Sequence, residues 1–154
     1  MELKDTELAY AAGVVDGEGC ICIIVHRPYS GRKYGEMKTP LHSLQVSVTN
    51  TRYELMEWFQ ERFDGAIYSK PGISNFITRQ PCFTWQVVAN KAQHFLQLIQ
   101  PYMVIKAEQV VLAIQFQERR SGSHGRRVTP EMLQERDSFK ERMTQLNKPY
   151  LVTR

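Results

Sequence analysis

Residues 8–25, with the sequence LAYAAGVVDGEGCICIIV, constrain the fold more than any other stretch of this chain. The pattern predicts a helix over 6–16, and small residues crowd one face of that helix and its end: Ala9, Ala12, Gly13 and Gly17. Small side chains let another backbone approach closely. That backbone is either the chain's own sheet or an identical helix across a two-fold axis, and the spacing alone leaves both open.

Two carboxylates, those of Asp16 and Glu18, stand where this helix must give way to a strand over 20–27, CICIIVHR. Negative charges at the C-terminal end of a helix are unfavourable, because the helix dipole is negative there. In the two-fold arrangement, two copies of Glu18 would lie side by side. Divalent cations that bridge carboxylates to phosphates would offset this repulsion.

The composition fits one intracellular domain over residues 1–154. With 42% apolar residues the chain can bury a core, and no apolar stretch reaches membrane-spanning length. The acidic N-terminus, MELKDTEL, is unlike a signal peptide. Cys20 and Cys22 share one face of a strand, where they cannot easily form a disulfide. A metal site that joins them to His26 is a weaker alternative, because the four histidines show no zinc spacing.

The net charge of +4 is modest, but its distribution is uneven. No Asp or Glu occurs from Gly65 to Lys106, a stretch that holds four cations: Lys70, Arg79, Lys91 and Lys106. A second basic cluster is offset only by Glu36: Arg27, Arg32, Lys33 and Lys38. If only the cations are considered, an ordinary solvated surface explains them. Acid-free strands with polar residues between the cations favour a polyanion surface, and nucleic acid is the leading partner class.

Hydrophobic periodicity predicts an alternating order of helices and strands. Helices are expected over 6–16, 52–65, 90–101, 106–120 and 129–148, and strands over 20–27, 42–50, 66–70, 73–79 and 82–89. A loop rich in Pro, Gly and Lys is expected over 28–40. This order predicts an α+β domain with one antiparallel sheet and helices on one face. Its core covers residues 5–120, and C-terminal helices cover 106–148.

The segment AAGVVDGEG at 11–19 resembles the LAGLIDADG motif of homing endonucleases. Four positions match that motif outright: Ala12, Gly13, Asp16 and Gly19. Glu18 stands for its second acid. The resemblance follows the order of elements to about Arg120, and it includes VTN ending at Asn50 and QPYMVIKAEQ at 100–109. It implies a saddle-shaped, four-stranded antiparallel sheet with helices on one face.

The resemblance also implies roles for individual residues. Glu18 corresponds to the metal-ligating acid, helped by the Gly17 carbonyl, and Asp16 to an acid that is more structural than catalytic. Asn50 matches a polar residue that orders water, and Lys106 matches a lysine that assists the attacking water or stabilises the charged phosphate. Mg²⁺ or Mn²⁺ is the implied cofactor, whereas Ca²⁺ is expected to support binding without cleavage.

The implied activity is site-specific cleavage of double-stranded DNA at a long, nearly palindromic target, by an intron-encoded homodimer. Alternation along the strands assigns these residues to the DNA-reading face: Ile24, His26, Ser43, Gln45, Ser47, Tyr68, Lys70, Thr84 and Gln86. Basic residues of the first loop are expected to contact DNA as well: Arg32, Lys33 and Lys38. Two features depart from the family pattern, because Glu54 stands near a usual basic position and the loop 28–40 does not align.

The main alternative is a protein of the same fold that binds nucleic acid without cutting it, either an intron RNA maturase or a DNA-binding regulator. Glu18, Asn50 and Lys106 favour cleavage, because a pure binder has no need of a metal-ligating acid beside a phosphate. An unrelated α+β protein with a tightly packed helix would instead be a monomer without affinity for DNA. Neither a membrane nor a small-molecule substrate is expected.

Overall fold

The computed structural model describes residues 2–31, 35–70, 81–123 and 125–149. Its helices are α1 (Asp5–Glu18), α2 (Tyr53–Phe63), α3 (Ala89–Ile99), the 3₁₀ helix η1 (Gln100–Tyr102), α4 (Ala107–Gly122) and α5 (Pro130–Leu146). Its strands are β1 (Gly19–His26), β2 (Tyr29–Gly31), β3 (Gly35–Met37), β4 (Leu41–Asn50), β5 (Ala66–Lys70) and β6 (Cys82–Val88).

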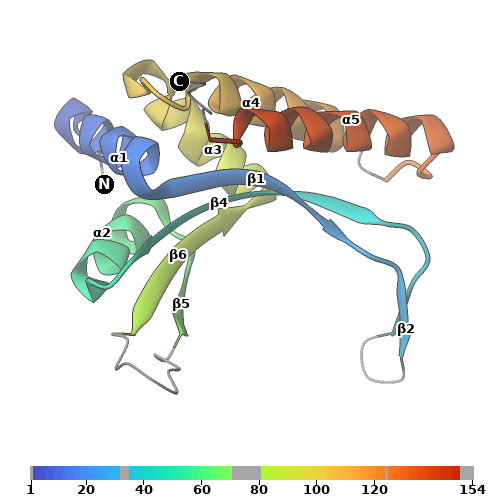
Figure 1. The fold of residues 1–154 in the computed structure, drawn as a ribbon, viewed down its shortest axis with the longest axis horizontal. Coiled ribbons are helices and arrows are strands. Elements are labelled where there is room, and N and C mark those ends of the chain that lie inside the picture. The colour runs from blue at the N-terminus through green and yellow to red at the C-terminus, as the bar shows by residue number, and fades with distance from the viewer. Residues whose placement is uncertain (1, 32–34, 71–80, 124, 150–154) are drawn as a thin grey trace, which may run out of the picture.

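The main sheet has four strands in the order β1-β4-β6-β5, and every neighbouring pair is antiparallel. Helices α1, α3, α4 and α5 lie along one side of this sheet (Figure 1). At both ends, toward β5 and toward β2, the strands bend away from those helices, so the opposite face is concave (Figure 1). The predicted α+β class is confirmed, with the four-stranded antiparallel sheet and its helical layer.

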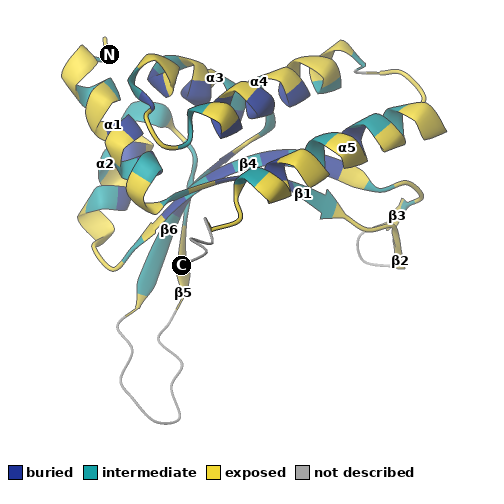
Figure 2. Cartoon of the chain, turned by 45° about the horizontal axis from the view of Figure 1, so that its top comes forward, coloured by how far each residue is buried: buried dark blue, intermediate teal, exposed yellow. Residues whose placement is uncertain are grey.

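Aromatic rings fill the core between the sheet and the helices. Phe59 of α2, Trp85 of β6 and Phe95 of α3 are all buried, and the ring centroids of Phe59 and Trp85 are 4.8 Å apart. Those of Trp85 and Phe95 are 5.0 Å apart in an edge-to-face arrangement. Such rings bury large apolar areas, and this packing fixes α2 and α3 against the sheet. Buried residues gather on the sides of the elements that face this layer (Figure 2).

Strand β4 alternates strictly between the two faces of the sheet. Its residues His42, Leu44, Val46 and Val48 are buried in the core, whereas Ser43, Gln45 and Ser47 between them are half-buried on the concave face. Because side chains alternate with a period of two, a slip of one residue would turn every polar side chain into the core. The register is therefore tightly specified.

Two predicted boundaries differ from the structure. The segment predicted as a loop over 28–40 contains β2 and β3, which pair as a separate two-stranded sheet with Ser30 opposite Glu36. Its Gly- and Lys-rich composition hides so short a pairing. Helix α1 continues to Glu18, and Gly19 ends it in an extended conformation, so both acids belong to its last turn. The strand predicted over 73–79 lies outside the described residues.

Candidate active site at the end of helix α1

Asp16 binds the chain where it enters α4. Its two carboxylate oxygens accept hydrogen bonds from three successive backbone N–H groups, those of Val104, Ile105 and Lys106, at 2.9, 3.1 and 2.9 Å. These groups precede the first turn of α4, where the helix dipole is positive and favours a carboxylate. The Asp16 carboxylate therefore joins the end of α1 to the start of α4.

Lys106 makes the reciprocal contact. Its Nζ donates to the carbonyl oxygens of Val15 and Gly19, at 2.8 and 2.6 Å, at the C-terminal end of α1. The last turn of α1 has no basic residue of its own. Because the helix dipole is negative there, the ammonium group supplies the charge that this helix end lacks. Lys106 is held half-buried beside the junction of α1 and β1.

Glu18 and Asn50 meet from the ends of two different elements. Asn50, the last residue of β4, donates from Nδ2 to Oε2 of Glu18 at 2.8 Å. Its Oδ1 accepts from the backbone N–H of Arg52 at 2.9 Å, and this bond orients the amide. Glu18 is exposed to solvent. The structure thus brings Glu18 and Asn50 into contact, and it places Lys106 on the same helix end.

The glycines of this segment differ in what they require. A Cβ atom on Gly19 would lie 2.7 Å from backbone atoms of Val15, so the turn from α1 into β1 needs glycine here. In contrast, a Cβ on Gly13 or on Gly17 would have nothing within 4 Å. No close approach within the described ranges accounts for small residues at those two positions. Of the other two small residues, Ala9 is exposed beside Gly13, but Ala12 is fully buried in the chain's own core.

Val104 and Ile105 form an exposed apolar pair that the sequence patterns do not predict. Their relative exposures are 82% and 72%, the largest among the exposed large hydrophobic residues of the described ranges. Asp16 holds the backbone of both residues, so the pair lies next to the last turns of α1. A pair of β-branched residues between η1 and α4 was the available signal. Together with the open face of α1, this pair makes an apolar surface without a partner in the described chain.

Most residues predicted to read DNA share the concave face. The register places Ser47 opposite Gln86, Gln45 opposite Cys22 and Thr84 opposite Tyr68. The same alternation brings four more of the predicted set to this face: Ile24, His26, Ser43 and Lys70. Lys38 is exposed just after β3, with its Nζ 3.9 Å from Glu36. Arg32 and Lys33 lie outside the described residues.

Cys20 and Cys22 of β1 also lie on this face, just after the end of α1. The pKa of the Cys20 thiol is lowered to about 6, chiefly by a hydrogen bond from the Cys22 thiol and further by the charge of Lys106, although burial opposes this shift. The same hydrogen bond and burial raise the pKa of Cys22. No three His, Cys, Asp or Glu side chains in the described ranges could hold a metal ion together. Cys20, Cys22 and His26 therefore do not form such a group in this structure.

The oxygen atoms at the end of α1 suit a divalent cation, but one chain offers too few of them to complete its coordination. Asp16 is committed to backbone N–H groups, which leaves the Glu18 carboxylate and the Gly17 carbonyl. Mg²⁺ prefers such oxygen ligands but takes six of them. A second copy of the chain, a phosphate group and water would have to supply the remaining ligands.

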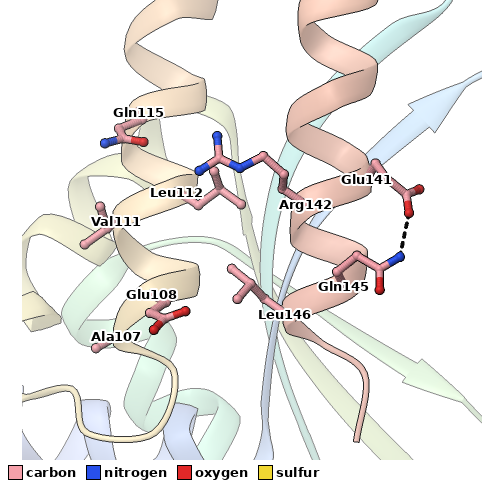
Figure 3. A pocket seen from close by; sticks show the side chains of 9 residues that line it. All are labelled: Ala107, Glu108, Val111, Leu112, Gln115, Glu141, Arg142, Gln145 and Leu146. Atoms are coloured by element: carbon pink, nitrogen blue, oxygen red, sulfur yellow. Dashed lines mark hydrogen bonds between the residues drawn. The ribbon is translucent and has the colours of Figure 1, made fainter.

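An apolar pocket between α4 and α5 lies apart from the cluster that Glu18, Asn50 and Lys106 form at the end of α1. Its lining includes Val111 and Leu112 of α4 and Leu146 of α5, with Arg142 and a Glu141–Gln145 hydrogen bond at its rim (Figure 3). None of Glu18, Asn50 or Lys106 lines it. In the described ranges no helix is both long and apolar enough to cross a membrane.

Comparison with solved structures identifies the fold. The chain superposes on the homing endonuclease I-CvuI, solved in complex with the I-CreI target, with a TM-score of 0.70 and 20% identity over 96% of this chain and 86% of that chain. It therefore has the fold of LAGLIDADG homing endonucleases, as the motif implied. No protein-family model matches the sequence, and neither does any curated protein.

Two further structures show how this chain relates in length to others of the fold. The archaeal intron-encoded homing endonuclease I-Vdi141I, complexed with DNA, matches with a TM-score of 0.71 and 17% identity over 97% of this chain and 89% of that chain. The LAGLIDADG homing endonuclease I-SmaMI, bound to cleaved DNA, matches with a TM-score of 0.68 and 18% identity. In that case the match covers 96% of this chain but 48% of the I-SmaMI chain.

Proposed function

We propose that this chain is a site-specific, metal-dependent DNA endonuclease that acts inside the cell as a homodimer. The observation that carries this proposal is the cluster of Glu18, Asn50 and Lys106. The cluster lies where α1 meets the concave sheet. A carboxylate that is held by an amide and left exposed beside a fixed ammonium group suits hydrolysis of a phosphodiester. The relatives in fold are homing endonucleases solved with DNA.

Two observations support the homodimer. The open face of α1 and the exposed pair Val104 and Ile105 form one apolar surface around the end of the helix. The chain also matches about half of I-SmaMI, so two copies of this chain correspond in length to one copy of that enzyme. Helix α1 packed against its symmetry mate would bring two Glu18 carboxylates together, one for each strand of the DNA.

The residues of this chain have separate tasks in the reaction. Glu18 and the Gly17 carbonyl would hold Mg²⁺ or Mn²⁺, which supplies Lewis-acid activation of water and charge neutralisation at the phosphate when bound. Asn50 holds Glu18 in position and leaves the second carboxylate oxygen free for a ligand. Lys106 places a positive charge beside the scissile phosphate, where it stabilises the additional negative charge of the transition state. Asp16 fixes the backbone from which Lys106 projects.

The concave face supplies target recognition. Short polar side chains such as Ser43, Gln45 and Ser47 reach base edges directly or through water, and the exposed cations contact phosphates. Two such sheets related by the dimer axis would read the two halves of a nearly palindromic site.

Cleavage selection from a randomised duplex library, with Mg²⁺ present, tests this function. The wild-type protein should enrich one family of cut sequences, and Glu18→Gln should bind the same sequences without cutting them. If the wild type binds a defined DNA or RNA sequence but never breaks DNA, the chain is a binding protein of the same fold. If it binds no nucleic acid, both readings are wrong.

A further inference from the structure

A cation-rich cavity lies at the C-terminal end of α4, at the opposite end of this helix from Lys106. It opens between the last turn of α4, the residues Ser123 and Arg126, and the first turns of α5, with a volume of about 300 Å³. Its charged lining consists of four arginines and two glutamates: Arg119, Arg120, Arg126, Arg136, Glu118 and Glu135. Helix α4 has 16 residues, so this cavity is roughly 24 Å along the helix from Lys106.

Arg136 is the most buried charged residue of this cavity. Its relative exposure is 7%, and its guanidinium donates a hydrogen bond to the Ser123 hydroxyl oxygen at 3.1 Å. In the described ranges no carboxylate lies within ion-pair distance of Arg136. An arginine cannot lose its proton, so a buried one is expected to have an anionic partner.

Arg120 faces the same cavity from α4 and is also without a carboxylate partner in the part of the chain that the structure describes. Its Nε donates to the carbonyl oxygen of His42 at 2.9 Å, which fixes the plane of the guanidinium. Burial lowers the pKa of Arg120, and the charge of Arg136 lowers it further. Two guanidinium groups thus face one space and repel each other.

The acidic residues of the cavity do not balance this charge. The four arginines outnumber the two glutamates, and Glu135 is bound by Arg119 through two hydrogen bonds, at 2.6 and 2.9 Å, while the charge of Arg136 acts on it as well. The C-terminal end of α4 offsets part of the positive charge, because its free carbonyl groups carry a partial negative charge. The Ser123 hydroxyl donates to one of them, the Arg120 carbonyl oxygen, at 2.9 Å. A helix end carries only about half a negative charge, which is less than the two unmatched guanidinium groups require.

We propose that Arg120, Ser123 and Arg136 form a binding site for a phosphate group. Guanidinium groups donate several N–H bonds in a fixed plane that matches phosphate oxygens, and the Ser123 hydroxyl, which accepts from Arg136, holds that guanidinium in place. The site is independent of the cleavage chemistry, because it contains no residue of the cluster at the end of α1. A backbone phosphate of DNA outside the central target and free inorganic phosphate are the two sources of such a group.

Thermal unfolding of the full chain in inorganic phosphate, against chloride at the same ionic strength, tests the site. At ten times its dissociation constant, phosphate should raise the wild-type midpoint by about 3–6 °C. Arg120→Gln should lose most of this rise. Arg142→Gln, which removes an exposed arginine of α5 outside the cavity, should keep it. Arg136→Gln should lose the rise in the same way. Because Arg136 is buried, this variant can fail to fold, and in that case Arg120→Gln, at a less buried position, still tests the site.

Binding to a short duplex and to one twice as long identifies the source of the phosphate. If the site holds a DNA phosphate, the longer duplex should bind the wild type more tightly, and Arg120→Gln should lose that gain and lower the salt slope by about 1. If inorganic phosphate stabilises the protein while duplex length has no effect, the site takes the free ion. The proposal is overturned if phosphate gives no shift beyond chloride and Arg120→Gln binds both duplexes like the wild type.

Discussion

Asp16 and Lys106 exchange contacts between two helix ends: the Asp16 carboxylate binds the backbone at the start of α4, and the Lys106 ammonium binds the carbonyl end of α1. Each charged group lies at the helix end whose dipole it complements. The two residues are 90 positions apart, so the order of the site depends on the complete fold.

Removing the Asp16 carboxylate should destabilise the protein. Asp16→Ala leaves three N–H groups without their acceptor, and we expect a loss of about 2 kcal/mol in the free energy of unfolding, measured by urea titration. Asp16→Asn keeps one acceptor oxygen and should lose less. If Asp16→Ala unfolds like the wild type but no longer cuts DNA, Asp16 has a chemical role and not a structural one.

Lys106→Met should slow cleavage much more than it weakens binding. Methionine keeps much of the length of the side chain but removes the charge beside the phosphate and the two bonds to the end of α1. Single-turnover cleavage of prebound DNA, at a temperature where the variant is folded, separates the two effects. Equal losses in cleavage rate and in affinity would make Lys106 an ordinary phosphate contact.

Gly13→Leu should produce folded monomers. A Cβ atom on Gly13 would have nothing within 4 Å in the described ranges, whereas a leucine there would force two packed α1 helices apart. Sedimentation should therefore show a dimer for the wild type and a monomer for this variant, with similar circular dichroism spectra. Gly19→Ala is the matched control, because its Cβ would clash with Val15 and should lower stability instead. A wild-type monomer at micromolar concentration, with and without DNA, would contradict the two-site mechanism.

Gln45→Ala should relax base preference at one symmetric pair of target positions. Gln45 lies in the middle of the concave face, opposite Cys22 and Val88. Lys38→Ala, which removes an exposed cation, should instead weaken binding to all sequences alike. Binding to a panel of single-base-pair variants measures both. Unchanged preferences for variants at Ser43, Gln45 and Ser47 would exclude this face as the reading surface.

The Glu7–Arg62 pair should make the stability of the protein fall at acidic pH. Bonds from the Lys4 backbone N–H and from Arg62 hold the pKa of Glu7 below its ordinary value of 4.5. Its contribution to stability is thus present above that value and is lost as the pH falls through the lowered pKa. Glu7→Gln should be less stable than the wild type at pH 7, and unfolding midpoints should converge as the pH falls through that lowered pKa. A constant difference across this range would show that the ionised pair is not the cause.

The sequence predicts the local features of this molecule well, because alternation and helical spacing are local signals. The polar face of β4 and the helix that ends at the two acids are examples. Contacts between distant segments are different: the bonds between Asp16 and the N–H groups of 104–106 depend on how α4 meets α1, and no periodicity encodes that. The burial of Ala12 also depends on a contact between distant segments, and a pattern of small residues does not show which of its members faces the sheet.

The single exposed carboxylate at the end of α1 has a consequence for how cutting depends on the amount of protein. If each copy brings one Glu18, a lone copy carries half of a cutting centre and is harmless to a genome. Below the dissociation constant of the pair, the number of competent molecules rises with the square of the number of chains. A host that expresses this gene weakly would be spared stray breaks, whereas a modest increase in expression would turn cutting on steeply.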